Sequence, residues 1–157
     1  MSDLRVAYGE ICSYSGMSYP SGWSLDHFVP KSGAPALAYE WSNYRLTIEQ
    51  INNNKGERTG LLDPFRIEAE WFVLDFATFY VRPNAGLNDA RRGEVERTIR
   101  VLGLNAEEFG RLRYSVVRGY AEGLLDITFV ADRYPFIRLE LERQGMTADV
   151  MGWFSAP

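Results

Sequence analysis

Residues 23–56 constrain the fold of this chain more than any other stretch, because strand, loop and helix signals follow one another closely within them. The sequence from residue 23 to residue 29 is typical of a short strand, and Pro30 opens the loop that ends it. A second short extended stretch is expected over residues 41–46. The pattern therefore predicts two short strands joined by a loop, with a helix to follow.

The helix is predicted from its boundary residues. Thr47 and Gln50 have the spacing of a capping box, in which the hydroxyl of the first residue accepts a hydrogen bond from the backbone amide of the fourth. The helix should begin at Ile48 and end near Gly56, since glycine suits a helix C-cap. Residues three apart share a helix face, so an apolar pair lies beside a polar pair, as a helix that lines a site requires. These pairs are Ile48 with Ile51, and Asn52 with Lys55.

The chain beyond residue 60 is predicted to contain one strand region and several helices. Residues 71–81 are rich in aromatic and β-branched side chains, which indicates one long strand or a hairpin. Helices are expected over residues 88–102, after a second capping box at Asn105–Glu108, and over residues 133–144. The expected fold class is therefore α+β, with a mostly helical C-terminal extension.

The length and composition predict one domain. Among the 157 residues, 46% are hydrophobic and 14% aromatic, which is enough to build a substantial core. We expect a compact, turn-rich unit over residues 8–60. A strand-plus-helix region over residues 61–157 should pack with it as one globular domain.

Features of the sequence favour the cytoplasm. No window approaches the roughly eighteen continuous apolar residues of a transmembrane helix, so no membrane partner is expected. Residues 1–5 lack the architecture of a signal peptide. The single cysteine, Cys12, excludes an intramolecular disulfide, and a reducing compartment is the default for such a chain.

The charge balance bears on nucleic-acid binding. The formal net charge is −4, and the acidic residues are spread along the chain. Proteins that grip nucleic acid unaided usually present a basic surface, because phosphate contacts and counterion release dominate affinity. If nucleic acid is the substrate, we expect weak stand-alone binding or a partner that delivers it, although local basic patches would also suffice.

Polar residues with complementary chemistry gather in residues 23–56. The only histidine, His27, directly follows Asp26. The carboxylate of Asp26 and the amide oxygen of Asn52 are hard ligands suited to one Mg²⁺ or Mn²⁺ ion. Histidine ordinarily titrates near neutrality, so His27 can accept a proton from an attacking water while Asn43 orients its ring. Since a metal that also holds phosphate stabilises the developing charge, the set predicts phosphodiester cleavage.

Geometry and charge add detail to this site. Adjacent residues of a strand point to opposite faces, so Asp26 and His27 can serve one site only if the strand twists or ends near Pro30. Four basic residues of the same stretch are candidate phosphate contacts, and for Lys31 and Arg45 a solvated surface charge is equally expected. The four candidates are Lys31, Arg45, Lys55 and Arg58.

These residues resemble the HNH endonuclease family. The matching positions are Asp26-His27, Asn43 and Asn52-x-x-Lys55-Gly56, for the family's Asp-His pair, its middle asparagine and its terminal Asn-x-x-Lys-Gly motif. The resemblance implies a ββα-metal (HNH) nuclease unit over residues 10–60, and a divalent ion, Mg²⁺ or Mn²⁺. The roles it implies are general base for His27, positioner of the base for Asn43, and metal ligands for Asp26 and Asn52.

A longer run of residues resembles a subset of that family. The run Asp-His-Phe-x-Pro-Lys-Ser, followed by Trp-Ser-Asn, is similar to HNH proteins of bacterial anti-phage defence systems, of the Septu and retron-associated type. Partners of such proteins are commonly ATPases. The resemblance therefore implies a phage-defence effector that cleaves DNA together with a protein partner.

The chain departs from the family at the structural zinc that many HNH proteins bind through two Cys-x-x-Cys pairs. Cys12 is followed three positions later by Ser15, and the second pair falls on Ile48 and Ile51. Four-coordinate zinc needs Cys or His ligands, so no structural zinc is expected. We expect Ile48 and Ile51 to pack against Cys12 instead.

Two alternatives remain open at this point. The acidic balance and the degenerate zinc positions suit a non-catalytic nucleic-acid-binding or protein-interaction subunit that retains the HNH fold. The intact set of polar residues favours the enzyme. An HNH nuclease that acts on RNA or on single strands is the second alternative.

Overall fold

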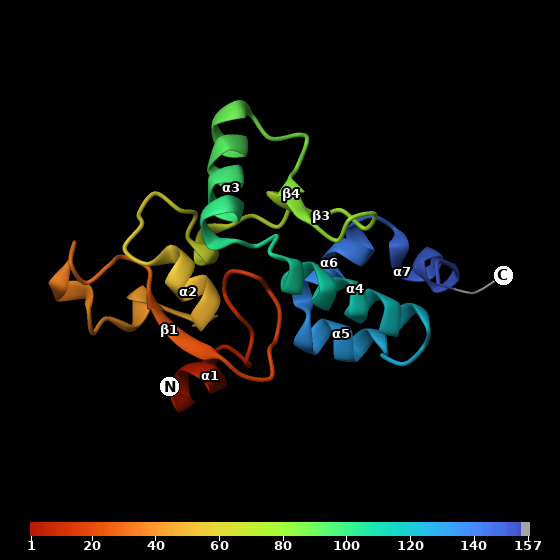
Figure 1. The fold of residues 1–157 in the computed structure, drawn as a ribbon, viewed down its shortest axis with the longest axis horizontal. Coiled ribbons are helices and arrows are strands. Elements are labelled where there is room, and N and C mark those ends of the chain that lie inside the picture. The colour runs from red at the N-terminus through yellow and green to blue at the C-terminus, as the bar shows by residue number, and fades with distance from the viewer. Residues whose placement is uncertain (155–157) are drawn as a thin grey trace.

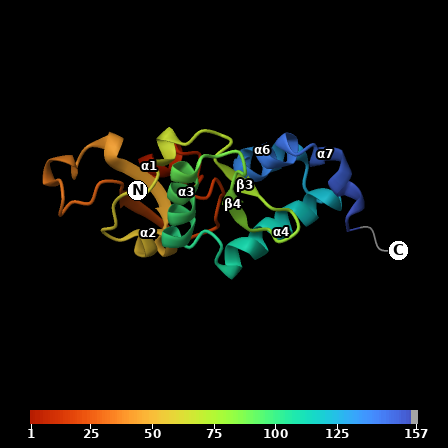
Figure 2. The same cartoon turned by 90° about the horizontal axis from the view of Figure 1, so that it is seen from above.

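Two small antiparallel sheets and a larger number of helices build this computed structural model, which describes residues 1–154. The described part of the chain is α+β and mostly helical. The N-terminal strands lie at one end of an elongated molecule and the C-terminal helices at the other. The long helix α3 (Asp89–Leu102) stands between the two ends (Figure 1, Figure 2).

The N-terminal end is a strand hairpin that packs against one helix. Its elements are α1 (Ser2–Ala7), β1 (Trp23–His27), β2 (Tyr44–Ile48) and α2 (Glu49–Lys55). The two strands pair antiparallel, with Asp26 opposite Arg45 and His27 opposite Tyr44. Two short 3₁₀ turns, Pro35–Leu37 and Trp41–Asn43, interrupt the loop that joins the strands. α2 packs against both strands.

Two local predictions for this end are wrong in detail. Asn43 lies in a 3₁₀ turn, and the second strand begins one residue later, at Tyr44. Thr47 lies within β2, where its hydroxyl oxygen is 3.5 Å from the Cys12 sulfur, so it does not cap α2. The helix begins at Glu49 without a side-chain cap. Its predicted end is confirmed, because Gly56 follows it with a φ of 51°, a conformation that glycine adopts readily.

The rest of the chain forms a second hairpin and the remaining helices. The elements after α2 are η3 (Pro64–Arg66), β3 (Phe72–Leu74), β4 (Val81–Pro83), α3, α4 (Glu107–Ala121), α5 (Ile127–Arg133), α6 (Pro135–Arg143), α7 (Met146–Asp149) and η4 (Val150–Gly152). β3 and β4 pair antiparallel. Of the two alternatives predicted for residues 71–81, the hairpin is therefore confirmed and the single long strand is wrong. The helix predicted over residues 88–102 is confirmed as α3.

Two helix starts in this region differ from the prediction. The amide of Asn105 does not cap α4; its Oδ1 accepts from the Val81 amide at 2.7 Å and its Nδ2 donates to the Val81 carbonyl at 2.8 Å. The helix expected over residues 133–144 is present as α6, which begins two residues later than predicted, with Pro135 as its first residue. The preceding residues form a separate helix, α5, which the sequence did not predict.

One buried cluster connects the two ends of the molecule. Cys12, Ile48 and Ile51 belong to it, which is the apolar packing expected where a zinc site would lie. The same cluster includes Val95 of α3 and Ile137 of α6. The hairpin that carries the candidate site is therefore anchored to the helical region through shared core packing.

No helix among the described residues is long and apolar enough to cross a membrane.

Candidate functional site

The imidazole of His27 is held by the backbone of the loop between β1 and β2. Its Nε2 lies 2.9 Å from the carbonyl oxygen of Ala38. The Tyr44 hydroxyl donates to the same carbonyl at 3.0 Å, and the Tyr44 ring meets the imidazole edge-on with centroids 5.2 Å apart. A carbonyl oxygen only accepts, so Nε2 must carry the proton and Nδ1 keeps its lone pair. His27 as a whole is partly exposed.

Asn43 braces this loop without touching the imidazole. Its Oδ1 accepts from the Val29 amide at 2.7 Å, and its Nδ2 donates to the carbonyls of Val29 at 3.0 Å and Leu37 at 3.2 Å. Leu37 directly precedes Ala38, whose carbonyl holds His27. None of the hydrogen bonds of Asn43 goes to the imidazole, so its predicted role as positioner of the base could act only through the loop backbone.

Asp26 lies in a different environment from its neighbour in sequence. Its Oδ1 accepts from the Lys55 ammonium at 2.8 Å, and its Oδ2 accepts from the Tyr14 hydroxyl at 2.5 Å. The side chains of Lys55 and Asp26 are 1% and 3% exposed. Burial, followed by the charge of Asp26, raises the pKa of Tyr14, so the hydroxyl stays protonated and continues to donate. Both carboxylate oxygens are thus occupied by protein groups.

Asn52 contacts β1 beside Asp26 but not Asp26 itself. Its Nδ2 donates to the Ser24 hydroxyl at 2.7 Å and to the Leu25 carbonyl at 3.2 Å. Ser24 and Asp26 alternate with His27 along the strand, so α2 packs on the side of β1 that faces away from the imidazole. The structure therefore groups Asp26, Asn52 and Lys55 on one side and leaves His27 on the other.

The predicted metal ligands do not fit a divalent ion in this arrangement. Each carboxylate oxygen of Asp26 already accepts a hydrogen bond, and the buried Lys55 ammonium neutralises the charge that would attract an ion. The amide of Asn52 lies against Ser24 and Leu25 rather than opposite the carboxylate. Among residues 1–154, no group of three or more His, Cys, Asp or Glu side chains is placed to hold a metal.

The predicted phosphate contacts divide into two buried and two exposed residues. Arg45 is 2% exposed and donates to Asp63 from Nε at 3.1 Å and from Nη2 at 2.7 Å. Its Nη1 donates to the carbonyls of Ser42 and Tyr44. Like Lys55, it is therefore fully used inside the protein. Lys31 and Arg58 lie on the surface, where Nη1 of Arg58 donates to the Asn54 carbonyl at 2.7 Å.

A groove opens beside the loop that holds His27. It has a volume of about 710 Å³ and runs between that loop, the segment after α2 and the start of α3. Its walls include Phe28, Asn43, Arg66, Trp71 and Arg91. Arg66 is exposed, and the guanidinium of Arg91 stacks on the Trp71 ring at 3.7 Å. Arginines and aromatic rings are the groups that bind phosphates and bases of nucleic acids.

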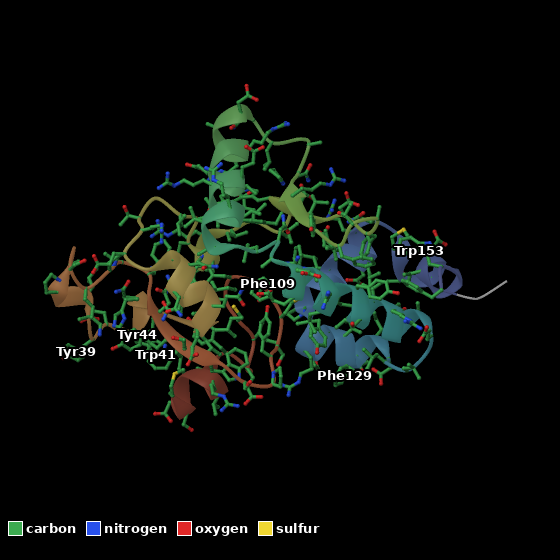
Figure 3. The ribbon with its side chains drawn as sticks, viewed as in Figure 1. Tyr39, Trp41, Tyr44, Phe109, Phe129 and Trp153 are labelled. Carbon is green, nitrogen blue, oxygen red and sulfur yellow. The ribbon has the colours of Figure 1, made fainter. Side chains whose placement is uncertain are left out.

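Aromatic side chains also project from the same loop. Tyr39 is 92% exposed and Trp41 is 54% exposed. The Trp41 ring meets Tyr44, the residue that supports His27, with centroids 6.1 Å apart. Figure 3 shows Tyr39, Trp41 and Tyr44 together at the N-terminal end of the molecule.

Three partners of the site were not predicted from the sequence. Tyr14 and Asp63 pair with Asp26 and Arg45, and each is a side chain that a buried charge requires. Asp63 could have been suspected, because an arginine on the buried face of a strand needs a carboxylate partner. The Ala38 carbonyl could not, since a backbone group leaves no signal in the sequence.

The comparisons with known proteins add no assignment to this geometry. No protein-family model matches the chain, and no curated protein sequence matches it.

Proposed function

We propose that this chain is an endonuclease of the HNH type, which hydrolyses phosphodiester bonds of DNA with His27 as the general base. One observation carries the proposal: the Ala38 carbonyl binds Nε2 of His27 and leaves Nδ1 as the basic nitrogen of a partly exposed imidazole. This imidazole lies at the end of the first strand of a strand–strand–helix unit, which is the order that a ββα-metal unit requires. The resemblance of Asp26-His27, Asn43 and Asn52 to the family motif supports the same assignment.

His27 would act by taking a proton from the attacking water. As the water oxygen bonds to phosphorus, Nδ1 accepts the water proton, and the opposite P–O bond to the sugar breaks, so that the leaving sugar oxygen takes a proton from solvent. The imidazolium that forms has two N–H donors, and the Ala38 carbonyl stabilises the one at Nε2. Tyr44 and the loop braced by Asn43 would limit rotation of the ring, so the lone pair of Nδ1 would keep one direction. Orientation of this kind lowers the barrier without a change in the chemistry.

The divalent ion, Mg²⁺ or Mn²⁺, is part of the proposal through the resemblance only. When bound, such an ion stabilises negative charge on the phosphate oxygens. Of its expected ligands, Asp26 is paired with Lys55 inside the protein, and Asn52 donates its amide nitrogen to Ser24. The step assigned to His27 does not depend on where the ion is held.

The DNA would lie across the loop between β1 and β2. Lys31, Arg58 and Arg66 offer exposed positive charge, and Tyr39 and Trp41 offer exposed rings for bases. The net charge of −4 predicts weak binding without help. We therefore include a cytoplasmic protein partner, such as an ATPase of a phage-defence complex, in the proposal.

A plasmid assay tests the proposal. Supercoiled DNA is incubated with wild-type protein, with His27→Ala and with a matched control, Asn53→Ala, which changes an exposed residue of α2. Each reaction contains Mg²⁺, Mn²⁺ or EDTA, with and without cell lysate. Linear duplex, single-stranded DNA and RNA are run in parallel. Nicking by wild type and Asn53→Ala but not by His27→Ala supports the proposal, and cutting of RNA alone would reassign the substrate.

The buried ion pair favours the non-catalytic alternative as a second candidate. Asp26 is neutralised by Lys55 inside the protein, which suits a scaffold as well as an enzyme. In that case none of the variants cuts any substrate, with or without lysate. If these inactive proteins still bind labelled DNA, the chain would be identified as a nucleic-acid-binding subunit.

A further inference from the structure

We propose that Lys55 is the resident cation of Asp26, so that this carboxylate binds a divalent metal only when the Lys55 ammonium is absent. The inference concerns the cation at Asp26 and holds whether or not the chain cleaves DNA. It assigns to Lys55 an internal role in place of the phosphate contact expected from the sequence.

Each oxygen of the buried carboxylate already accepts a hydrogen bond from a protein group. The Lys55 ammonium is 2.8 Å from Oδ1 of Asp26 and also donates to the His27 carbonyl at 2.8 Å. The Tyr14 hydroxyl donates to Oδ2 at 2.5 Å. A divalent ion binds carboxylate oxygens at about 2.0–2.6 Å, which is closer than the ammonium nitrogen. An ion at Oδ1 would lie close to the ammonium inside a buried site, and relief of the repulsion between the two cations would require the ammonium to be displaced.

Burial makes this displacement unfavourable. The Lys55 and Asp26 side chains are 1% and 3% exposed, so each charge has lost its water and depends on the other. An ammonium pushed off Asp26 would have to find another counter-charge or reach solvent. A positively charged ion brought against the same pair would also be repelled by the ammonium. Lys55 thus both occupies the oxygen and opposes a second cation.

The placement of α2 on β1 explains why Lys55 and not Asn52 meets Asp26. Asn52 and Lys55 are three residues apart, which is about 4.5 Å along a helix axis. Asn52 contacts Ser24 and Leu25, and Lys55 contacts Asp26 and the His27 carbonyl. The helix therefore follows the direction of the strand and delivers the ammonium at Asp26. The amide nitrogen of Asn52 is bonded earlier along β1, to Ser24 and Leu25.

A metal-binding experiment tests the assignment. Mn²⁺ binding is measured by isothermal titration calorimetry and by the loss of the free-ion EPR signal, for wild type, Lys55→Met and the double variant Lys55→Met/Asp26→Asn. We expect no Asp26-dependent binding in wild type, binding at least tenfold tighter in Lys55→Met, and loss of that binding in the double variant. Tyr14→Phe is the matched control, since it removes the other partner of Asp26 but leaves the ammonium, and it should gain no site.

Opposite results would overturn the proposal. Wild-type protein that binds one Mn²⁺ ion, with the binding abolished by Asp26→Asn and not strengthened by Lys55→Met, would show that Lys55 does not occupy the site. Circular dichroism checks that each variant folds. If Lys55→Met does not fold, Lys55→Gln takes its place, because glutamine can still donate to the His27 carbonyl. The comparison of wild type with Asp26→Asn decides the matter should both Lys55 variants unfold.

Discussion

The two sides of β1 differ sharply, although His27 and Asp26 are neighbours in the chain. His27 is partly exposed and is held by one backbone carbonyl, with a second ring nitrogen left free. Asp26 is buried, and both of its oxygens are taken by Lys55 and Tyr14. The base of the proposed reaction is thus preorganised, while the expected metal ligand is already neutralised. Two residues adjacent in a motif can therefore have different roles when their side chains point to opposite faces of one strand.

Replacement of His27 tests the exposed side and carries the largest expected effect. If the chain cuts DNA, His27→Ala should reduce the cleavage rate by about 10²- to 10⁴-fold, because general base catalysis contributes that much. Its unfolding in urea should change little, since the ring is partly exposed and makes one hydrogen bond to the Ala38 carbonyl. A cleavage time course on plasmid gives the rate. A variant that cuts as fast as wild type would remove His27 from the mechanism.

Loss of the Lys55 charge tests the buried side. Lys55→Met leaves Asp26 buried without its cation and should lower the free energy of unfolding by about 3–5 kcal/mol at pH 7. The matched control is Lys31→Met, which changes an exposed lysine. This variant should change the free energy of unfolding by less than about 0.5 kcal/mol. Urea denaturation followed by tryptophan fluorescence measures both. An equal decrease in the free energy of unfolding of the two variants would mean that solvent reaches the Asp26 carboxylate.

Replacement of Asn43 tests the loop that holds His27. Asn43→Ala removes three hydrogen bonds to the backbone of Val29 and Leu37, and should cost about 2–3 kcal/mol of stability because the groups left behind are poorly solvated. If cleavage is observed, it should fall by about 10- to 100-fold as the Ala38 carbonyl loses its position. Denaturation and cleavage are measured on the same preparation. Unchanged cleavage in a destabilised variant would show that the loop does not position His27.

Removal of the Tyr14 hydroxyl is the mildest test. Tyr14→Phe keeps the ion pair and should cost about 1.5 kcal/mol at pH 7, the value of a hydrogen bond to a charged group. The raised pKa of Tyr14 means that the unfolded chain releases this proton first as pH rises above about 10. Stability should therefore fall with pH in that range, by about 1.4 kcal/mol per pH unit for this tyrosine, and less steeply in Tyr14→Phe. Equal slopes of stability against pH in wild type and Tyr14→Phe would show that Tyr14 does not donate to the Asp26 carboxylate.

The elements were predicted best where the signal is local and nothing competes with it. The first strand begins at Trp23 as expected, α2 ends at Lys55 with Gly56 as its C-cap, and α3 ends at Leu102. In α3 the residues Val95 and Ile99 face the core, in agreement with their helical spacing. These features depend on neighbours within one or two turns.

Both predicted capping boxes failed because their polar side chains bind distant parts of the chain. The Thr47 hydroxyl meets Cys12, and the Asn105 amide pairs with the backbone of Val81. Each long-range contact satisfies a buried polar group that water cannot reach, which outweighs a helix cap that solvent can replace. Local cap signals are therefore least dependable next to a sheet.

The sequence by itself determined which residues carry reactive groups and that Asp26 and His27 must point to opposite faces of a strand. Only the tertiary structure decided what each of them meets. His27 finds the Ala38 carbonyl 11 positions away, and Asp26 finds Lys55 29 positions away. The first contact depends on the path of a loop and the second on how a helix lies along a strand. Neither is set by local preference, because both result from packing that the whole core imposes.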